Sequence, residues 1–283
     1  MLRKIRIALA TVFFLCITGL FLDFSGTWES IFGWMAKLQF LPAVLGMSLI
    51  PVILVLALTL LMGRIYCSVI CPMGVFQDVV AWISRRFKKQ NPYSYSKPKT
   101  WLRLTVLVLF VVLLVAGFNG IALLVAPYSA YGRMVNSLLQ PLYIMGNNVL
   151  ADVAAQQNSV AFYTVEPHLL VWPLLIVAAV TLVVIVVLAS IGGRTYCNTI
   201  CPVGTVLGYV AKFSWLKPVI DKHQCIGCNK CAKNCKAAAI QIDKKNGILS
   251  VDYTRCVACG NCMEVCPKDA MAFCHPYKQI PHP

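Results

Sequence analysis

Four long stretches without a charged residue constrain the fold of this chain more than any other feature. They comprise residues 7–22, 38–63, 104–132 and 167–193. A membrane-spanning helix needs about 20 mainly apolar residues, and the last three stretches are long enough to span with some tilt. The chain is 59% hydrophobic and 12% charged, whereas a soluble domain carries about 25% charged residues. This composition excludes an ordinary globular protein and a disordered chain. We predict four transmembrane helices, at roughly 5–23, 42–62, 102–125 and 170–191.

The first stretch is short, and its basic start is also typical of a secretory signal peptide. No A-x-A-like cleavage site follows Leu22, so a retained helix is the favoured interpretation. Arg3, Lys4 and Arg6 would reach back to the membrane interface while their apolar stems stay buried.

The basic residues follow the predicted membrane boundaries. All but Lys37 and Arg133 of the 25 lie in the N-terminal tip, in the segment 63–103 or after residue 193. By the positive-inside rule, both termini and the middle loop face the cytoplasm of a bacterial inner membrane. The formal net charge of +15 therefore has a membrane explanation, and we expect no nucleic-acid partner.

A twelve-residue motif occurs twice. Residues 63–74 and 193–204 share most positions at a constant offset of 130, with the pattern G-R-x-Y-C-x-x-x-C-P. Each copy follows two predicted helices, and both copies lie on the cytoplasmic side. The sequence therefore predicts a membrane all-α four-helix bundle, built from two parallel two-helix repeats.

The motif cysteines are candidate metal ligands. If Cys-x-x-x-Cys is helical, its two sulfurs lie one turn apart on one face, and two pairs that meet would present four thiolates. Such a set suits iron–sulfur or zinc; its members are Cys67, Cys71, Cys197 and Cys201. Thiol–disulfide chemistry and simple packing of small apolar side chains are the alternatives. Each motif arginine would offset the thiolate charge or hold a lipid phosphate, and each motif proline would start the next helix.

Eight further cysteines form a second repeat in the tail. The spacing Cys-x2-Cys-x2-Cys-x3-Cys starts at Cys225 and recurs at an offset of 31 from Cys256. This is the bacterial two-cluster ferredoxin pattern, in which the fourth cysteine ligates the other cluster. One predicted 4Fe–4S site thus comprises Cys225, Cys228, Cys231 and Cys266. The other comprises Cys256, Cys259, Cys262 and Cys235. Zinc and disulfides fit this spacing and compartment less well.

The tail should fold as a small α+β ferredoxin-like domain of residues 215–283, after a membrane domain of residues 1–214. Between the cysteine runs, segments 239–242 and 248–251 flank Asn246-Gly247, a hairpin signal. Lys236 stands where proline usually follows the first run. We expect Cys16 and Cys274, which belong to neither pattern, to be packing residues.

This combination of four helices, two C-x-x-x-C-P motifs and a two-cluster tail resembles the NapH/MauN group of membrane quinol dehydrogenase components. The resemblance covers essentially the whole chain. It implies an electron-transfer subunit of an oxidoreductase complex, with quinone as substrate, the membrane quinone pool as one partner and a ferredoxin-like or cytochrome subunit as another. Two other functions stay open: a membrane metal or thiol reductase that serves assembly of another redox enzyme, and an iron–sulfur redox sensor.

Few residues qualify as the acid–base group that a quinone site needs. Asp78 on the inner side and Glu166-Pro167-His168 on the outer side are the candidates, although an ordinary interfacial role is favoured for each. The outer segment 127–169 has apolar residues near helical spacing from Met134 to Ile144. This pattern predicts an amphipathic helix that lies on the membrane or docks a partner.

Overall fold

The computed structural model describes residues 2–87, 93, 97–156, 163–166, 172–221, 223–242 and 249–275. Helices dominate as far as residue 211, and short strands occur only after it in this part of the chain. The helices of the first half are α1 (Leu2–Leu22), α2 (Thr27–Lys37), α3 (Phe40–Leu45), α4 (Leu49–Met62), α5 (Tyr66–Val69) and α6 (Pro72–Phe87). Those of the second half are α7 (Thr100–Val115), α8 (Asn119–Val125), α9 (Pro127–Met134), the π-helix η1 (Val135–Leu139), α10 (Gln140–Gln156), α11 (Trp172–Gly192), α12 (Thr195–Thr199) and α13 (Pro202–Ala211).

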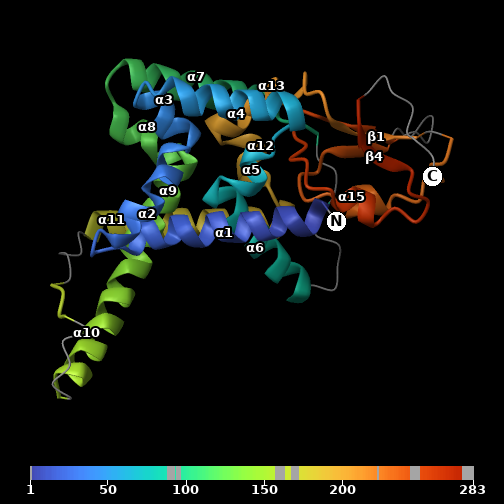
Figure 1. Ribbon diagram of the computed structural model, residues 1–283. Helices are drawn as coiled ribbons and strands as arrows, with labels where there is room; N and C mark the ends of the chain where they lie inside the picture. The colour runs from blue at the N-terminus through green and yellow to red at the C-terminus, as the bar shows by residue number, and fades with distance from the viewer. Residues whose placement is uncertain are drawn as a thin grey trace.

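The axes of the apolar helices α1, α4, α7 and α11 are roughly parallel or antiparallel to one another (Figure 1). Their cytoplasm-predicted ends lie toward the cysteine-rich tail, where α15 (Asn261–Glu264) sits beside the start of α1. Two of these helices, α1 and α11, are long and apolar enough to cross a membrane by themselves among the described residues.

The other two predicted spans are not continuous helices. The predicted helix 42–62 is divided at residues 46–48, where Met47 takes a left-handed φ of 51°. The predicted helix 102–125 is divided at residues 116–118, where Gly117 has a φ of 82°. A left-handed residue cannot continue an α-helix, so each stretch becomes a longer helix and a short one at an angle to it. Four uninterrupted spans are therefore not confirmed.

The last helix of each half of the repeat packs against the long helix of the other half. In each half a long helix, one short turn and a third helix follow one another, as α4–α5–α6 and as α11–α12–α13. α6 packs against α11 of the other half, and α13 packs against α4. As predicted, Pro72 and Pro202 begin the third helices, because proline lacks only an N–H that the first helical turn leaves unpaired. This packing brings the two motifs into contact at the centre of the bundle.

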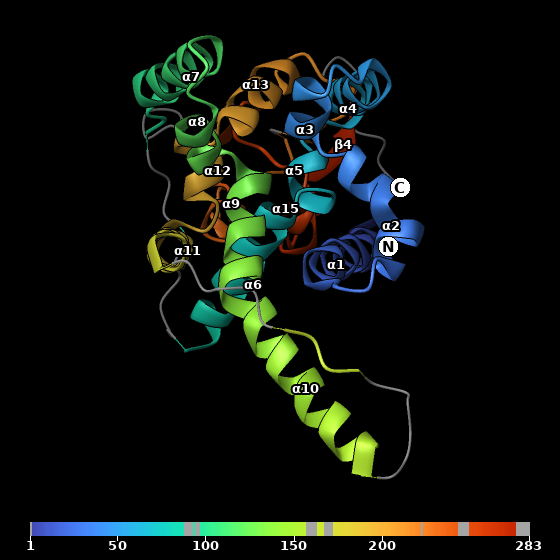
Figure 2. The same cartoon turned by 90° about the vertical axis from the view of Figure 1, so that its left-hand side faces the viewer.

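The outer segment differs from its prediction. Ala130, Tyr131, Met134 and Val135 are buried in the main core, so α9 and η1 belong to the bundle and do not lie on a membrane surface. α10 extends away from the body of the protein, as Figure 2 shows. The reason is local: small and aromatic side chains on α9 allow close packing against α6, α8 and α11.

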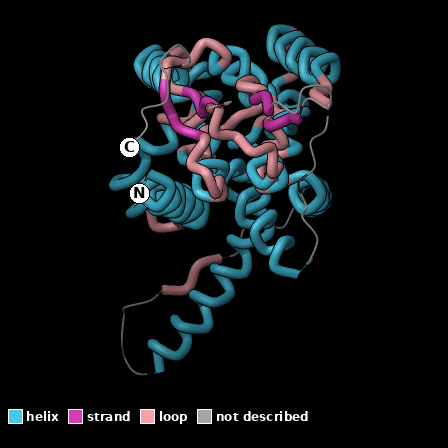
Figure 3. The backbone as a smooth tube through the Cα atoms, turned by 90° about the vertical axis from the view of Figure 1, so that its right-hand side faces the viewer, coloured by secondary structure: helices cyan, strands magenta, loops and turns pink. Residues whose placement is uncertain are grey.

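The tail caps one end of the bundle, beside the start of α1, with loops and two small antiparallel sheets, as Figure 3 shows. β1 (Lys217–Ile220) pairs with β4 (Met271–Cys274), with Lys217 opposite Cys274. β2 (Ile240–Ile242) pairs with β3 (Leu249–Val251) as the hairpin signal predicted; its turn, Asn246-Gly247, lies outside the described residues. The short helices are α14 (Lys230–Lys233) and α15.

The cysteine loops repeat in backbone conformation as well as in sequence. Left-handed residues occur in three pairs at the sequence offset of 31: Gly227 and Ala258, Asn229 and Gly260, Ala238 and Asp269. Two of these positions carry glycine in only one copy and the third carries it in neither, so the fold maintains a backbone that most side chains disfavour. Such turns aim successive backbone N–H groups at one point, which suits an anionic ligand.

Candidate functional site

The first tail cavity collects the four cysteines that spacing assigned to one cluster. Cys225, Cys228, Cys231 and Cys266 all line it, among otherwise mostly apolar neighbours such as Leu249. Cys228 is exposed, and the adjacent Ile226 is 61% exposed. This cavity therefore lies at the surface of the tail.

The second tail cavity collects the other predicted set. Cys235, Cys256, Cys259 and Cys262 line it, with apolar side chains from both sheets around them. None of these four cysteines is exposed. The crossed arrangement, three cysteines from one run and the fourth from the other, is thus present in both cavities.

Both cavities fit the group that their cysteines imply. Burial raises the pKa of Cys231 to about 11 and that of Cys256 to about 12. Metal binds the thiolate form, so metal binding at these sulfurs displaces protons. Four thiols that line one small apolar cavity match the ligand set of a 4Fe–4S cluster.

The motif cysteines form a third group, at the junction of the two repeats. All are almost fully buried: Cys67, Cys71, Cys197 and Cys201 are 3%, 4%, 2% and 3% exposed. The expectation of one helix through each pair is wrong. Cys67 and Cys197 lie in the short turns α5 and α12, whereas Cys201 caps α13 and its Sγ accepts the N–H of Gly204 at 3.2 Å. The proline that follows each second cysteine ends the first turn and starts a new helix.

Each motif arginine reaches across to the other motif. The Arg64 guanidinium donates to the Cys197 carbonyl at 3.2 Å, and its Nη2 lies 3.9 Å from the Cys67 sulfur. The Arg194 guanidinium donates to the Cys67 carbonyl. Both arginines are fully buried, so the predicted alternative of a lipid phosphate on them is wrong.

The glycine at the end of each motif makes room for the arginine that reaches across from the other motif. A Cβ atom on Gly204 would overlap the Cys197 carbonyl and lie 2.8 Å from Nη2 of Arg64. A Cβ atom on Gly74 would overlap the Cys67 carbonyl and lie 3.2 Å from Nη1 of Arg194. The repeated G-R-x-Y-C-x-x-x-C-P-x-G pattern therefore allows the two motifs to pack against each other, with the arginine of one beside the glycine of the other.

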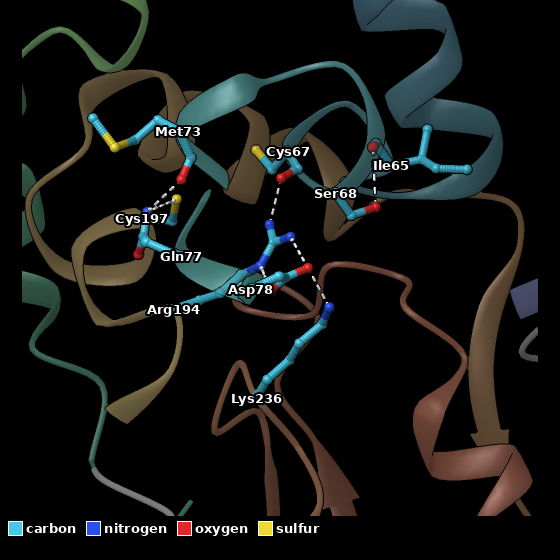
Figure 4. Close-up of polar contacts among 9 residues, drawn as sticks. All are labelled: Ile65, Cys67, Ser68, Met73, Gln77, Asp78, Arg194, Cys197 and Lys236. Carbon is cyan, nitrogen blue, oxygen red and sulfur yellow. Dashed lines mark hydrogen bonds and ion pairs between the residues drawn. The ribbon is translucent and has the colours of Figure 1, made fainter. Parts of the chain in front are cut away.

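Asp78 neutralises one side of this pair. Its carboxylate accepts from Arg194 at 2.8 and 2.6 Å and also from the Lys236 ammonium, as Figure 4 shows. Burial by itself raises the pKa of Asp78, but the two cations outweigh burial and hold the pKa well below its usual range. Asp78 is thus a permanent counter-ion and a poor proton acceptor for quinol chemistry.

Arg64 has no such counter-ion. The position equivalent to Asp78 in the second repeat is Gly208, and Arg64 instead donates to the Asn198 amide oxygen at 2.8 Å and the Thr254 carbonyl at 3.0 Å. Among the described residues no carboxylate lies within ion-pair distance of it, and its Nε atom has no acceptor. A buried, unpaired cation is costly unless a negative charge lies nearby.

Direct contacts connect the second tail cavity to the motif cysteines. Thr254, which accepts from Arg64, is two residues from Cys256. On the other side, Asn198 donates to the Ala237 carbonyl at 2.9 Å, and Arg194 N–H donates to the Lys236 carbonyl at 2.9 Å. The Lys236 departure from proline noted in the sequence has its explanation here, because the lysine closes the ion pair with Asp78.

Three buried polar side chains at the site carried no sequence signal. Gln77 donates to the Cys197 sulfur at 3.1 Å and is fully buried. Arg103 is 1% exposed and donates to Thr254 Oγ1 at 3.2 Å. Asn198, the third, was visible only as a variable position inside the motif. Gln77 has no counterpart in the second repeat, because Leu207 occupies the equivalent position there.

The remaining predicted residues lie apart from these groups. Cys16 packs with Ile17 and Met35, and Cys274 is buried on β4. Glu166 is exposed, while Pro167 and His168 lie outside the described residues.

Comparison with known families agrees with this architecture. A family model described as a 4Fe-4S binding domain matches residues 44–90 and 171–222, one segment in each half of the repeat. A second, described as a 4Fe-4S dicluster domain, matches residues 218–273. No solved structure matches the chain.

Curated relatives point the same way. Ferredoxin-type protein NapH of Haemophilus influenzae is 25% identical over 228 residues, 78% of this chain and 66% of NapH. YccM of Escherichia coli is 25% identical over 229 residues, 80% of this chain and 55% of YccM. NADH-quinone oxidoreductase subunit I of Pelobacter propionicus is 39% identical over 61 residues, 18% of this chain and 33% of that subunit. The chain is an iron–sulfur electron-transfer protein related to NapH and YccM, and the predicted resemblance is confirmed; it spans about half to two thirds of these two relatives.

Proposed function

We propose that the chain is an integral membrane subunit that passes electrons between quinol and a redox partner protein through a line of three iron–sulfur centres. The observation that carries this proposal is the order of the three cysteine groups. Cysteines of the exposed tail cavity pack against cysteines of the buried one. The backbone carbonyls of Thr254 and Lys236, beside the buried cavity, accept hydrogen bonds from the motif residues Arg64 and Arg194. Electrons would thus have a contiguous route from the protein surface to the bundle.

Two 4Fe–4S clusters would occupy the tail domain, residues 215–283, with the ligands that line its two cavities. When bound, each cluster supplies one-electron redox chemistry. The chain's own contribution is to exclude water with apolar side chains and to aim backbone N–H groups at the sulfurs, which sets the reduction potential. The exposed Cys228 side marks where a partner protein would approach.

The charge balance supports a third centre at Cys67, Cys71, Cys197 and Cys201. Arg64 and Arg103 are buried without an ion pair among the described residues, and Arg194 shares Asp78 with Lys236. Four thiolates would supply the missing negative charge. No group of three or more His, Cys, Asp or Glu side chains in the described ranges is arranged to hold a metal ion, so the proposal of a third iron–sulfur centre rests on this charge balance. Gln77 and Gly204 would then donate hydrogen bonds to its sulfurs.

The surface of the helices supports insertion in a membrane. Large apolar side chains are exposed along all four apolar helices, for example Ile50 at 81%, Val108 at 59% and Val183 at 60%. Contiguous apolar surface of this extent marks a membrane-facing protein. At 1.5 Å per residue, the 14 residues of α4 reach about 21 Å, short of the roughly 30 Å hydrocarbon core. We propose that α3 and α8 complete the second and third crossings, with both termini in the cytoplasm.

The thiol-reductase alternative fits the structure less well. The motif cysteines are at most 4% exposed, so a disulfide or metal substrate has no access to them.

The test is quinol oxidation by the full chain. Protein purified without oxygen and placed in lipid nanodiscs is mixed with a quinol analogue and an artificial electron acceptor, and the clusters are followed by absorbance and EPR. We expect sustained electron flux in the wild type and in Cys16→Ala, and loss of flux in Cys67→Ala with the tail clusters still intact. Intact clusters that never exchange electrons with any quinol would reject the proposal, and one reduction without turnover would favour the sensor.

A further inference from the structure

A basic cleft lies between α1, α6 and the tail. It has a volume of about 510 Å³ and extends to Cys259 of the buried tail cavity. Its charged lining is mainly cationic, and the cations are Arg3, Arg6, Arg85, Arg86 and Lys236. Ile7, Ala10, Val75, Val79 and Trp82 form an apolar wall on the side of the two helices.

Most of these cations already have partners within the protein. Arg3 pairs with Glu264, and Lys236 pairs with Asp78. Arg85 donates to the Asn234 amide oxygen at 2.9 Å. Asp78 is the only carboxylate among the residues that line the cleft, and Arg194 and Lys236 engage it.

Arg6 keeps donors that have no partner. Its guanidinium interacts with the Cys259 thiol, but its Nε and Nη1 atoms are buried and neither donates to any acceptor in the described part of the chain. Buried donors in native proteins are nearly always paired, and a guanidinium fork prefers a carboxylate or phosphate. Arg86, exposed on α6, lines the same cleft and leaves a second guanidinium available at its mouth.

The position of the cleft narrows the ligand further. Arg6 belongs to the first turns of α1, at the end of the bundle that carries the tail (Figure 1). If the helices cross the membrane as proposed, this is the level of the inner-leaflet headgroups. A cationic rim above an apolar wall suits a molecule with a phosphate at one end and a hydrocarbon chain at the other.

We propose that this cleft is a binding site for a phosphate group, supplied in the membrane by an anionic phospholipid. Arg6 and Arg86 hold the phosphate oxygens, and the lipid chain lies along Ile7, Ala10 and Val79. Because Arg6 and Cys259 line the same cleft, the bound anion offsets positive charge beside a predicted cluster ligand. The expected consequence is a lower reduction potential of that cluster, since net charge near the sulfurs sets it.

The test uses the full chain in mild detergent and calorimetric titration with short-chain phosphatidylglycerol, short-chain phosphatidylcholine and inorganic phosphate in separate arms. Arg6→Gln and Arg86→Gln remove one charge each from the cleft. Lys212→Gln removes the same charge from an exposed site at the same end of the bundle and is the matched control. If Arg6→Gln does not fold, Arg86→Gln still tests the site, because Arg86 is exposed and its replacement should not disturb the fold.

We expect one saturable phosphatidylglycerol site per chain, weakened about tenfold or more by Arg6→Gln and unchanged within about twofold by Lys212→Gln. Phosphatidylcholine should bind more weakly. Equal affinity for inorganic phosphate would support the phosphate site and identify free phosphate as its source. No saturable binding of either anion, or equal weakening by Arg6→Gln and Lys212→Gln, would overturn the proposal. Neither result depends on quinol oxidation, so this test and that of the proposed function fail independently.

Discussion

Replacing Asp78 with asparagine removes one charge from the centre of the molecule. Arg194, with a side chain 0% exposed, then loses its carboxylate partner, and Lys236, 17% exposed, loses its own. Removal of one member of a buried ion pair costs about 3–5 kcal/mol, because the partner charge stays buried and uncompensated. Asp78 is itself 19% exposed, so we take about 3 kcal/mol, the lower end of that range.

The assay is thermal unfolding of the full chain in detergent, with the exposed pair Arg3–Glu264 as the internal reference. At roughly 2–4 °C per kcal/mol for a chain of this size, Asp78→Asn should lower Tm by about 6–12 °C. Glu264→Gln breaks a pair whose side chains are 40% and 43% exposed, and an exposed pair contributes about 0–1 kcal/mol. Its Tm should therefore fall by no more than about 4 °C.

The pH dependence of the Tm difference tests whether the charge of Asp78 causes it. Burial opposes ionisation of Asp78, yet Arg194 and Lys236 lower its pKa well below the usual value. A depressed pKa means that the stabilisation is fully present above the unfolded-state pKa of about 3.9 and is lost as the pH falls through the folded-state value. The difference between wild type and Asp78→Asn should be constant from about pH 5 to pH 8 and shrink in acid. Equal Tm values for Asp78→Asn and Glu264→Gln would refute the argument that Asp78 is a buried counter-ion.

Three further substitutions test other parts of the two motifs, and a fourth, on α10, is a control. Gly204→Ala should destabilise the protein by about 1–3 kcal/mol through overpacking, whereas Gly146→Ala, with nothing within 4 Å of the new Cβ, should stabilise α10 by about 0.5–1 kcal/mol; thermal unfolding compares them. Tyr196→Phe removes a 2.6 Å hydrogen bond to the Val125 carbonyl and should cost about 1–2 kcal/mol in the same assay. Arg64→Gln should release iron from the proposed third centre and leave the tail clusters intact, as measured by iron analysis and EPR.

Much of the tail could be predicted from the sequence. The spacing from Cys225 and from Cys256 matches the two-cluster ferredoxin pattern, in which the fourth cysteine of each run ligates the other cluster, and the cysteines line two cavities in this crossed arrangement. The hairpin around Asn246-Gly247 followed from its turn residues and alternating strands. These features depend on residues that are close together in the chain, so their spacing can be read directly from the sequence.

The bundle was only partly predictable. Hydropathy located the apolar helices but not their interruptions. A residue with a left-handed backbone, such as Met47, can itself be apolar, so the interruption does not change the hydropathy of the stretch. The repeat predicted that the two motifs meet, but not that Arg64 and Arg194 cross between them. That exchange follows from the packing of α6 on α11 and of α13 on α4, which depends on side-chain shape across the whole bundle.

Asp78 and Lys236 show how one structural fact can explain two separate sequence observations. In the sequence, the acid is a candidate for proton transfer, and the lysine departs from the proline that usually follows the first cysteine run. In the structure they form one ion pair with each other. Neither role was visible alone, because the residues are 158 positions apart.

The most direct test of the central claim is an iron and acid-labile sulfide count, with EPR, on protein kept free of oxygen. The comparison is between wild type and a variant in which Cys67, Cys71, Cys197 and Cys201 are all alanine, with Cys16→Ala as control. We predict about eight irons and two 4Fe–4S signals in the variant, and additional iron in wild type and in the control. A wild type without iron in its last seventy residues, or the same iron content in wild type and the fourfold variant, would contradict the relay of three centres.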